Sequence, residues 1–171
     1  MPSRKARYVY WDSCVFLAYI DKEPGRVDVI ERVWDEVSDQ GGDRIVTSVL
    51  SIAEVAHAGY EKKSQALDPA AIAAIDAMWK DPSVLIVETP AQIMYIARDL
   101  MRDATAQGWS LRPGDAIQLA TAKWVHQYAN PITAFHTYDG RIFKYTAMIG
   151  IKIVEPEPLS KNIQLPLIPP T

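Results

Sequence analysis

Short apolar segments without polar alternation recur along this chain, and longer amphipathic stretches separate them. A strand that is apolar on both faces is typical of a parallel sheet, because helices cover both sides of such a sheet. Strands that alternate with helices therefore predict a parallel α/β fold. The expected strands lie at residues 8–11, 44–47, 84–87, 132–136 and 151–154. We expect an α/β/α sandwich of three layers around a central parallel sheet of about five strands.

Apolar stripes with helical spacing predict the helices that cover this sheet. One stripe runs through residues 93–104, where charged side chains occupy the opposite face. A second helix is expected to begin near Pro113, because proline suits a first helical turn. The residues expected on its apolar face are Ile117, Ala120, Thr121, Trp124, Val125 and Tyr128. Further helices are expected at residues 23–40 and 69–80, and one from about Ser48 to Lys63.

The composition fits one domain with a single core. The chain has 171 residues, of which 49% are hydrophobic, and such a chain can bury a sizeable core. A net charge of −3 argues against a surface that grips nucleic acid along its whole length, so a nucleic-acid partner would need a local basic patch. A single cysteine and the lack of an apolar leader predict a cytoplasmic protein without a membrane span.

Prolines recur towards the end of the chain and exclude regular helix or central strand there. They stand at positions 156, 158, 166, 169 and 170. We therefore expect one domain at residues 1–155 and a proline-rich tail at residues 156–171.

Four acidic residues, Asp12, Glu54, Asp115 and Asp139, fall where an expected strand gives way to a helix or turn. The carboxyl ends of parallel strands open onto one edge of the sheet, so these side chains are expected to converge there. Carboxylates that meet in a crevice repel one another unless a divalent cation supplies positive charge. Carboxylate oxygens are ligands that Mg²⁺ and Mn²⁺ prefer. The pattern predicts a shared Mg²⁺ or Mn²⁺ site.

Each acid also has a local explanation when it is taken alone. Asp12 is suited to cap the helix that follows it, and Ser51-x-x-Glu54 has the spacing of a capping box. Asp115 in a first turn is favoured by the helix dipole, while Asp139-Gly140 is a common turn dipeptide. Capping alone does not require all four acids to lie on one edge of the sheet, so their conjunction favours the shared site.

The four acids lie in segments whose order and spacing are similar to those of a known family. The segments are VYWDS at residues 9–13, TSVLSIAE at 47–54, PGDAIQLATA at 113–122 and TYD at 137–139. Together they resemble the PIN-domain nucleases, in particular the VapC-type ribonuclease toxins of toxin–antitoxin pairs. The resemblance covers about residues 8–154 and implies a PIN-like fold.

The resemblance also implies the chemistry of the four acids: Mg²⁺- or Mn²⁺-dependent hydrolysis of RNA phosphodiester bonds, with Asp12, Glu54, Asp115 and Asp139 as the metal-binding and catalytic set. Ser13 and Thr137 match small hydroxyl residues that support this set. This chain departs from the family pattern at Cys14, where many members have asparagine, and at Arg141, where many have a further aspartate. The loss of the second acid weakens one metal position.

Basic residues near the acids in sequence are the candidates for contact with RNA. Arg112, Arg141 and Lys144 lie close to Asp115 or Asp139 in the chain, although such residues are often only solvated surface charges. Toxins of this family often dimerise and are silenced by a protein antitoxin. The expected partners are therefore RNA, an antitoxin and a second copy of the chain.

Other functions remain open from the sequence. Arg141 in place of an acid is consistent with a PIN-like module that binds RNA or protein without catalysis. A phosphatase that forms an aspartyl phosphate would use Asp12, but it usually has a second acid where this chain has Cys14. Cys14 as a thiol nucleophile, with His57, His126 or His136 as its base, ranks below a buried hydrophobic role for the cysteine.

Overall fold

The expected strands form one sheet in the order β3–β2–β1–β4–β5, and every neighbouring pair is parallel. The structure is a computed structural model that describes residues 5–39 and 42–159. The strands are β1 (Tyr8–Trp11), β2 (Arg44–Ser48), β3 (Val84–Val87), β4 (Ile132–His136) and β5 (Ile153–Val154). Only β5 is clearly shorter than expected, because the chain leaves the preceding helix through Gly150 in the left-handed conformation (φ +71°).

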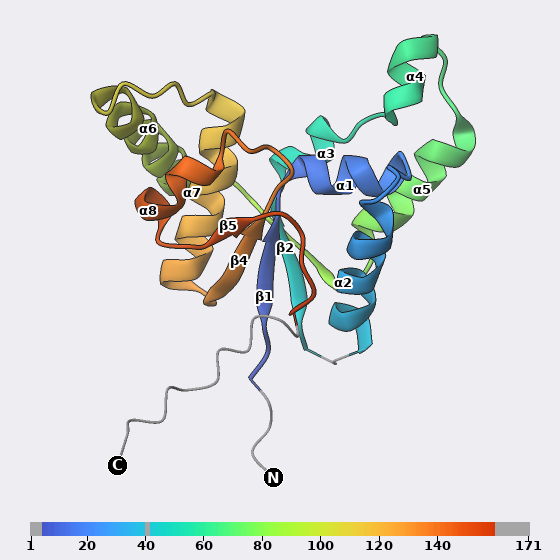
Figure 1. Cartoon of the computed structure of the whole chain (residues 1–171), viewed down its shortest axis with the longest axis horizontal. Helices are drawn as coiled ribbons and strands as arrows, with labels where there is room; N and C mark the ends of the chain where they lie inside the picture. The colour runs from blue at the N-terminus through green and yellow to red at the C-terminus, as the bar shows by residue number, and fades with distance from the viewer. Residues whose placement is uncertain (1–4, 40–41, 160–171) are drawn as a thin grey trace.

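Helices cover both faces of the sheet, which confirms the three-layer α/β/α sandwich (Figure 1). One face packs against α1 (Ser13–Ile20), α2 (Val27–Asp39) and α5 (Pro69–Trp79). The other packs against α6 (Ala91–Ala106), α7 (Pro113–Tyr128) and α8 (Thr146–Ile149). A short 3₁₀ helix, η1 (Phe143–Tyr145), precedes α8.

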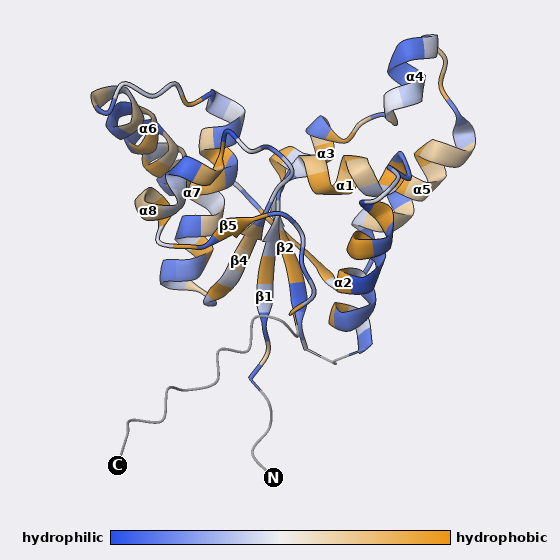
Figure 2. Cartoon of the chain, viewed as in Figure 1, coloured by the Kyte–Doolittle hydropathy of each residue, from blue (hydrophilic) through white to orange (hydrophobic). Residues whose placement is uncertain are grey.

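Alternate side chains of the central strand feed the two halves of the core. Tyr10 joins the α7 side, where its ring stacks on Phe135 at 4.8 Å. Val9 and Trp11 join the opposite side, where Trp11 packs edge-on against Phe16. All of these side chains are buried, and burial of each large apolar group contributes roughly 2 kcal/mol. Orange, hydrophobic stretches occur in β1, β2, β4 and β5 and alternate with paler ones (Figure 2).

Several helix boundaries differ from the prediction. The chain turns at residues 23–26, with Gly25 at φ +78°, so α2 begins at Val27. The helix expected from Ser48 to Lys63 is two helices, α3 (Leu50–Glu54) and α4 (Gly59–Ser64). The prediction that Lys62 and Lys63 end the helix of Glu54 is therefore wrong.

The apolar face predicted for α7 was also partly wrong. Tyr128 is 71% exposed, because it is the last residue of the helix. Gln118, Leu119 and Ala122 are buried instead. The buried surface of α7 is wide because the helix packs on the sheet on one side and on α6 on the other.

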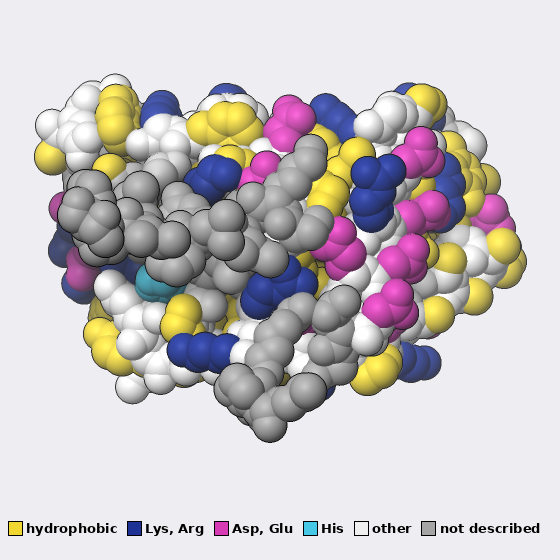
Figure 3. Space-filling model, turned by 60° about the horizontal axis from the view of Figure 1, so that its bottom comes forward, with side chains coloured by type: hydrophobic (Ala, Val, Ile, Leu, Met, Phe, Trp, Pro, Cys, Tyr) yellow, Lys and Arg dark blue, Asp and Glu magenta, His cyan; other side chains and the backbone are white. Residues whose placement is uncertain are grey.

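The described start of the tail packs onto the body of the domain. Pro156, Pro158 and Leu159 are buried, and the Leu159 N–H donates to Glu36 at 2.7 Å. Residues 160–171 lie outside the described residues. Within the described residues, no helix is long and apolar enough to cross a membrane. Basic and acidic side chains are interspersed on the described part of the face in Figure 3.

Candidate functional site

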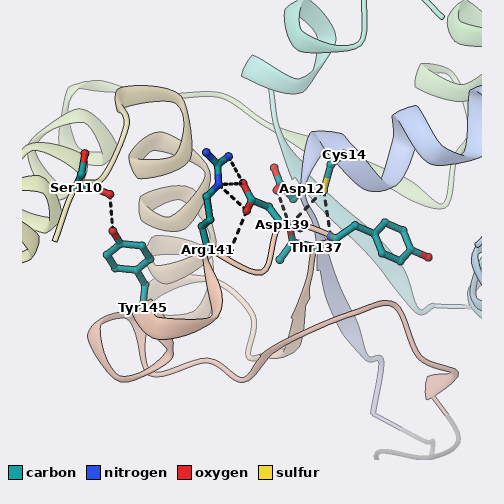
Figure 4. Close-up of polar contacts among 8 residues, drawn as sticks. Asp12, Cys14, Ser110, Thr137, Asp139, Arg141 and Tyr145 are labelled. Atoms are coloured by element: carbon teal, nitrogen blue, oxygen red, sulfur yellow. Dashed lines mark hydrogen bonds and ion pairs between the residues drawn. The ribbon is translucent and has the colours of Figure 1, made fainter. Parts of the chain in front are cut away.

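Two of the four acids lie at the point where the strand order reverses. Asp12 directly follows β1 and is the N-cap of α1, and Asp139 lies three residues after β4. Because β1 and β4 are neighbours at the centre of the sheet, both acids sit at the edge where open α/β sheets bind their ligands. Figure 4 shows Asp12 and Asp139 near each other, with Thr137 between them.

The other two acids reach this edge from α3 and α7. Glu54 is the last residue of α3, which follows β2, and Asp115 lies in the first turn of α7. The first turn of α7 lies close against Glu54, since a Cβ atom at Gly114 would come within 3.1 Å of Glu54 Oε1. The structure therefore brings together all four acids named from the sequence.

Asp12 is half-buried, and several donors surround its carboxylate. Its Oδ1 accepts the Ser13 N–H at 2.7 Å, and its Oδ2 accepts the Thr137 hydroxyl at 2.8 Å. Burial raises the pKa of Asp12 from 3.8 to about 6, with a further contribution from Glu54, and the hydrogen bonds only partly offset this rise. Asp12 therefore both caps α1 and belongs to the acidic site.

Thr137 links the two central acids. Its hydroxyl donates to Asp12, and the same oxygen accepts the Asp139 N–H at 3.0 Å. Cys14 braces this link, because its sulfur lies 3.2 Å from Thr137 Oγ1 and accepts the Tyr138 N–H at 3.2 Å. The loop after β4 is thereby held against the start of α1 (Figure 4).

The cysteine environment does not favour a thiol nucleophile. Burial raises the pKa of Cys14 to about 12, with a further contribution from Asp12, so the thiol stays protonated at neutral pH. Among the hydrogen bonds of the described residues, none joins Cys14 to a histidine. His126 accepts the Ile132 N–H through Nδ1 at 3.0 Å.

A buried polar network holds Glu54. Gln118 Nε2 lies 2.8 Å from Glu54 Oε2, 2.8 Å from Ser13 Oγ and 3.0 Å from Ser51 Oγ. Tyr10 fixes the amide by donating its hydroxyl to Gln118 Oε1 at 2.6 Å, and the Ser13 hydroxyl donates to Glu54. The alternative explanation of Glu54 as part of a capping box with Ser51 does not hold, since Val49 is the N-cap of α3.

Sequence reasoning assigned no role to Gln118 and considered Ser51 only as a helix cap. The available signal was a long polar side chain, Gln118, between Ile117 and Leu119 on a helix that covers the sheet. A polar group that is only 2% exposed needs partners, and here those partners belong to the acidic site.

Asp115 and Asp139 differ in their environment. Burial raises the pKa of Asp115, and the nearby carboxylates of Asp139 and Glu54 raise it further. Hydrogen bonds from Arg141 instead hold the pKa of Asp139 below its ordinary value. The Arg141 guanidinium reaches Asp139 Oδ1 through Nε at 2.9 Å and Oδ2 through Nη2 at 2.5 Å.

The donor set fits a hard divalent cation at Asp12, Glu54 and Asp115. All of their donors are carboxylate oxygens, and Glu54 raises the pKa of both Asp12 and Asp115, so a cation would relieve this repulsion. Asp139 is already paired with Arg141. Within the described ranges, no three or more His, Cys, Asp or Glu side chains are arranged closely enough to hold an ion directly. Mg²⁺ commonly keeps several of its waters and binds through few carboxylates.

Comparison with known families identifies the fold. A profile of the PIN domain family matches residues 9–147, which is most of the chain. The chain belongs to the PIN domain family. A comparison with curated proteins returned no match.

Solved structures with the same fold include toxins of toxin–antitoxin pairs. VapBC2 of Rickettsia felis, bound to a DNA fragment from its promoter, aligns with a TM-score of 0.62 at 13% identity, over 86% of this chain and 98% of that chain. VapBC-1 of nontypeable Haemophilus influenzae aligns with a TM-score of 0.60 at 15% identity, over 86% and 97%. VapC20 of Mycobacterium tuberculosis, a toxin that cleaves the sarcin–ricin loop, aligns with a TM-score of 0.59 at 16% identity, over 86% and 99%. This PIN domain therefore has the fold found in VapC toxins.

Proposed function

We propose that this PIN domain is a metal-dependent endoribonuclease that hydrolyses RNA phosphodiester bonds and acts as the toxin of a toxin–antitoxin pair. The observation that carries the proposal is the convergence of Asp12, Glu54, Asp115 and Asp139 at the switch point of the sheet. Structural neighbours that include a toxin that cleaves the sarcin–ricin loop and a VapBC complex support the same function.

Asp12, Glu54 and Asp115 would hold Mg²⁺ or Mn²⁺, and Asp139 would complete the set or act as a base. When bound, such an ion supplies the positive charge that activates water and neutralises the scissile phosphate. Ser13 and Thr137 orient the carboxylates of Glu54 and Asp12 by hydrogen bonds. Gln118 holds Glu54 from the buried side and thereby fixes the direction of its free oxygen.

The partners follow from the same proposal. RNA would contact Arg112, Arg141 and Lys144, which line one pocket beside Asp115. The complexes of VapBC2 and VapBC-1 support a protein antitoxin, and a homodimer is a further proposal. The nuclease domain would span residues 1–155 with a tail at 156–171, and the protein would act in the cytoplasm.

Labelled RNA tests this function directly. The purified chain is incubated with single-stranded RNA and Mn²⁺ or Mg²⁺, and excess chelator is added to a parallel sample. We expect internal cleavage that the chelator stops, because the carboxylates need the cation to engage phosphate. RNA binding without cleavage would instead identify a non-catalytic module, which the Arg141–Asp139 pair favours as the second candidate. Phosphate release from a small ester without RNA cleavage would identify a phosphatase.

Replacing Gln118 by leucine is expected to slow cleavage by about 10–100-fold, the usual cost of losing a group that orients a metal ligand. The free energy of unfolding should fall by about 1–3 kcal/mol, since the buried Tyr10 hydroxyl loses its acceptor. Cleavage rates over a range of Mn²⁺ concentrations and thermal melts measure the two effects. Tyr10→Phe serves as the control, because it leaves the amide contact to Glu54 in place. Equal cleavage by Gln118→Leu and the wild type at every metal concentration would contradict this role.

A further inference from the structure

A pocket of about 310 Å³ adjoins the acidic site on the α7 side. Its walls include Ser110, Arg112 and Asp115 from the start of α7 and Arg141, Lys144 and Tyr145 from the segment after β4. Asp115 and Arg141 belong both to this pocket and to the surroundings of the four acids. A ligand in the pocket would therefore lie directly beside the acids.

Among the described residues, two of the three cations of this pocket form no ion pair, although Arg112 lies near enough to Asp115 to lower the pKa of that carboxyl. Arg141 is paired with Asp139, whereas among the described residues neither Arg112 nor Lys144 forms an ion pair. The Lys144 ammonium is instead held against aromatic rings, 5.4 Å from the Trp109 centroid and 5.3 Å from that of Tyr145. Three cations against Asp115 and Asp139 leave the pocket with a net positive charge.

The back of the pocket is rigid. Tyr145 is buried, and its hydroxyl donates to the Ser110 carbonyl at 2.9 Å. Its ring packs edge-on against Trp109 at 5.6 Å. Figure 4 shows Tyr145 tied to Ser110, with Arg141 between Tyr145 and Asp139. The aromatic wall is therefore formed before any ligand binds, and little ordering cost is left for the binding step.

We infer that this pocket is a subsite for one nucleotide of the RNA, which it holds by the phosphate next to the scissile bond, independently of a metal ion. The term subsite rests on the proposed nuclease function, which makes RNA the substrate. A volume of about 310 Å³ lies at the small end of ligand sites and suits one nucleotide rather than a longer piece. The Arg112 fork and the Lys144 ammonium suit phosphate oxygens.

The positions of the basic residues predict on which side of the acids a flanking phosphate of the RNA would lie. Positive charge lies on the Asp115 side of the acids, at Arg112 before the first turn of α7 and at Lys144 within η1, so the RNA would place one flanking phosphate there. Arg141 shields Asp139 from that phosphate by its two-point contact.

Binding of a mononucleotide to the full chain in excess chelator tests the inference. Adenosine 5′-monophosphate is titrated, with inorganic phosphate and adenosine as separate arms, and binding is followed by calorimetry and by competition. We expect saturable binding of the nucleotide, weaker competition by phosphate and none by adenosine. Lys144→Ala and Arg112→Ala should each weaken nucleotide binding about five- to tenfold, as expected for the loss of one charged contact.

Lys80→Ala is the matched control, because it removes the same charge from an exposed position at the end of α5. Its dissociation constant should equal that of the wild type. Both pocket variants change exposed side chains, and thermal melts verify that they fold. Adenosine binding as tightly as the nucleotide would overturn the assignment to phosphate, and equal binding by the pocket variants and the wild type would overturn the location.

The outcome is separable from that of the cleavage assay, since no metal is present and no bond is broken. A chain that cuts RNA but whose pocket variants bind the nucleotide normally would overturn the subsite alone. A chain that binds the nucleotide through Arg112 and Lys144 but never cuts RNA would keep the binding site and overturn the nuclease.

Discussion

Asp12→Asn is expected to lower RNA cleavage by about 100-fold or more and, at the same time, to stabilise the metal-free protein. The first effect follows because removal of a metal ligand should lower activity at least as much as removal of a group that only orients a ligand. The second kind of change lowers activity roughly 10–100-fold. The second effect follows because burial raises the pKa of Asp12 to about 6. A carboxylate that is ionised at neutral pH against such a shift costs about 2–3 kcal/mol of folding free energy.

The sign of the pH dependence makes this prediction specific. The folded state binds a proton at Asp12 between about pH 6 and pH 3.8, where the unfolded state does not. The contribution of Asp12 to stability is therefore most favourable below about pH 4 and is lost as pH rises through 6. The advantage of asparagine should be full above about pH 6.5 and should vanish near pH 3.5.

Urea unfolding in chelator at several pH values measures this difference, and the cleavage assay measures the loss of activity. Asp76→Asn, on the exposed face of α5, is the control and should change neither quantity. A variant that cuts RNA like its parent would refute the role of Asp12, and a variant that is less stable at pH 7.5 would refute the cost of burying its charged form.

The largest effect of acid on stability is expected from His136. This residue is fully buried, and both of its ring nitrogens lack a hydrogen-bond partner among the described residues. Burial lowers the pKa of His136 from 6.5 to about 3, although nearby Glu157 opposes this and Lys152 adds to it. The unfolded chain therefore takes up a proton at His136 between pH 6.5 and pH 3 while the folded chain does not. Stability should fall by about 3–5 kcal/mol across this window as pH decreases.

Replacement of His136 by phenylalanine should remove this loss. The difference in unfolding free energy between His136→Phe and the wild type, measured at each pH from 7.5 to 3.5, isolates the histidine from the opposite contribution of Asp12. We expect the difference to grow in favour of phenylalanine as pH falls. A difference that stays constant over the whole range would show that His136 is already hydrated or charged in the folded protein.

The fold was accessible from the sequence because its strands are short and apolar on both faces. The segments Tyr8–Trp11 and Ile45–Val46 show no alternation of charged and apolar side chains, and Val9, Trp11 and Ile45 are all buried; this pattern is compatible with few arrangements other than a covered parallel sheet. The convergence of Asp12 and Asp139 followed from the same argument, because parallel strands end at one edge. Helix ends were predicted less well, since α3 and α4 are separated only by a local turn.

The side-chain contacts that hold Glu54 and Asp139 could not be predicted from the sequence in the same way. Gln118 contributes through hydrogen bonds to residues 64 and more positions away, and no local pattern encodes partners at that separation. The pairing of Arg141 with Asp139 depends on the turn geometry after β4. Spacing indicated which residues are close in the chain, whereas side-chain direction decided which of them touch.

The first six residues of α7 include Gly114, Asp115 and Gln118. Helix α7 therefore carries Gly114, which leaves room for the Glu54 side chain, and Gln118, whose amide donates to Glu54. It also carries the acid Asp115. Any sliding or rotation of α7 over the sheet would displace these three residues together. Unfolding of its first turn would disrupt one half of the acidic centre, whereas Asp12 and Thr137 would keep their positions. The integrity of the centre thus depends on how firmly α7 packs on the sheet, together with the conformation of the loop after β4 that carries Thr137 and Asp139.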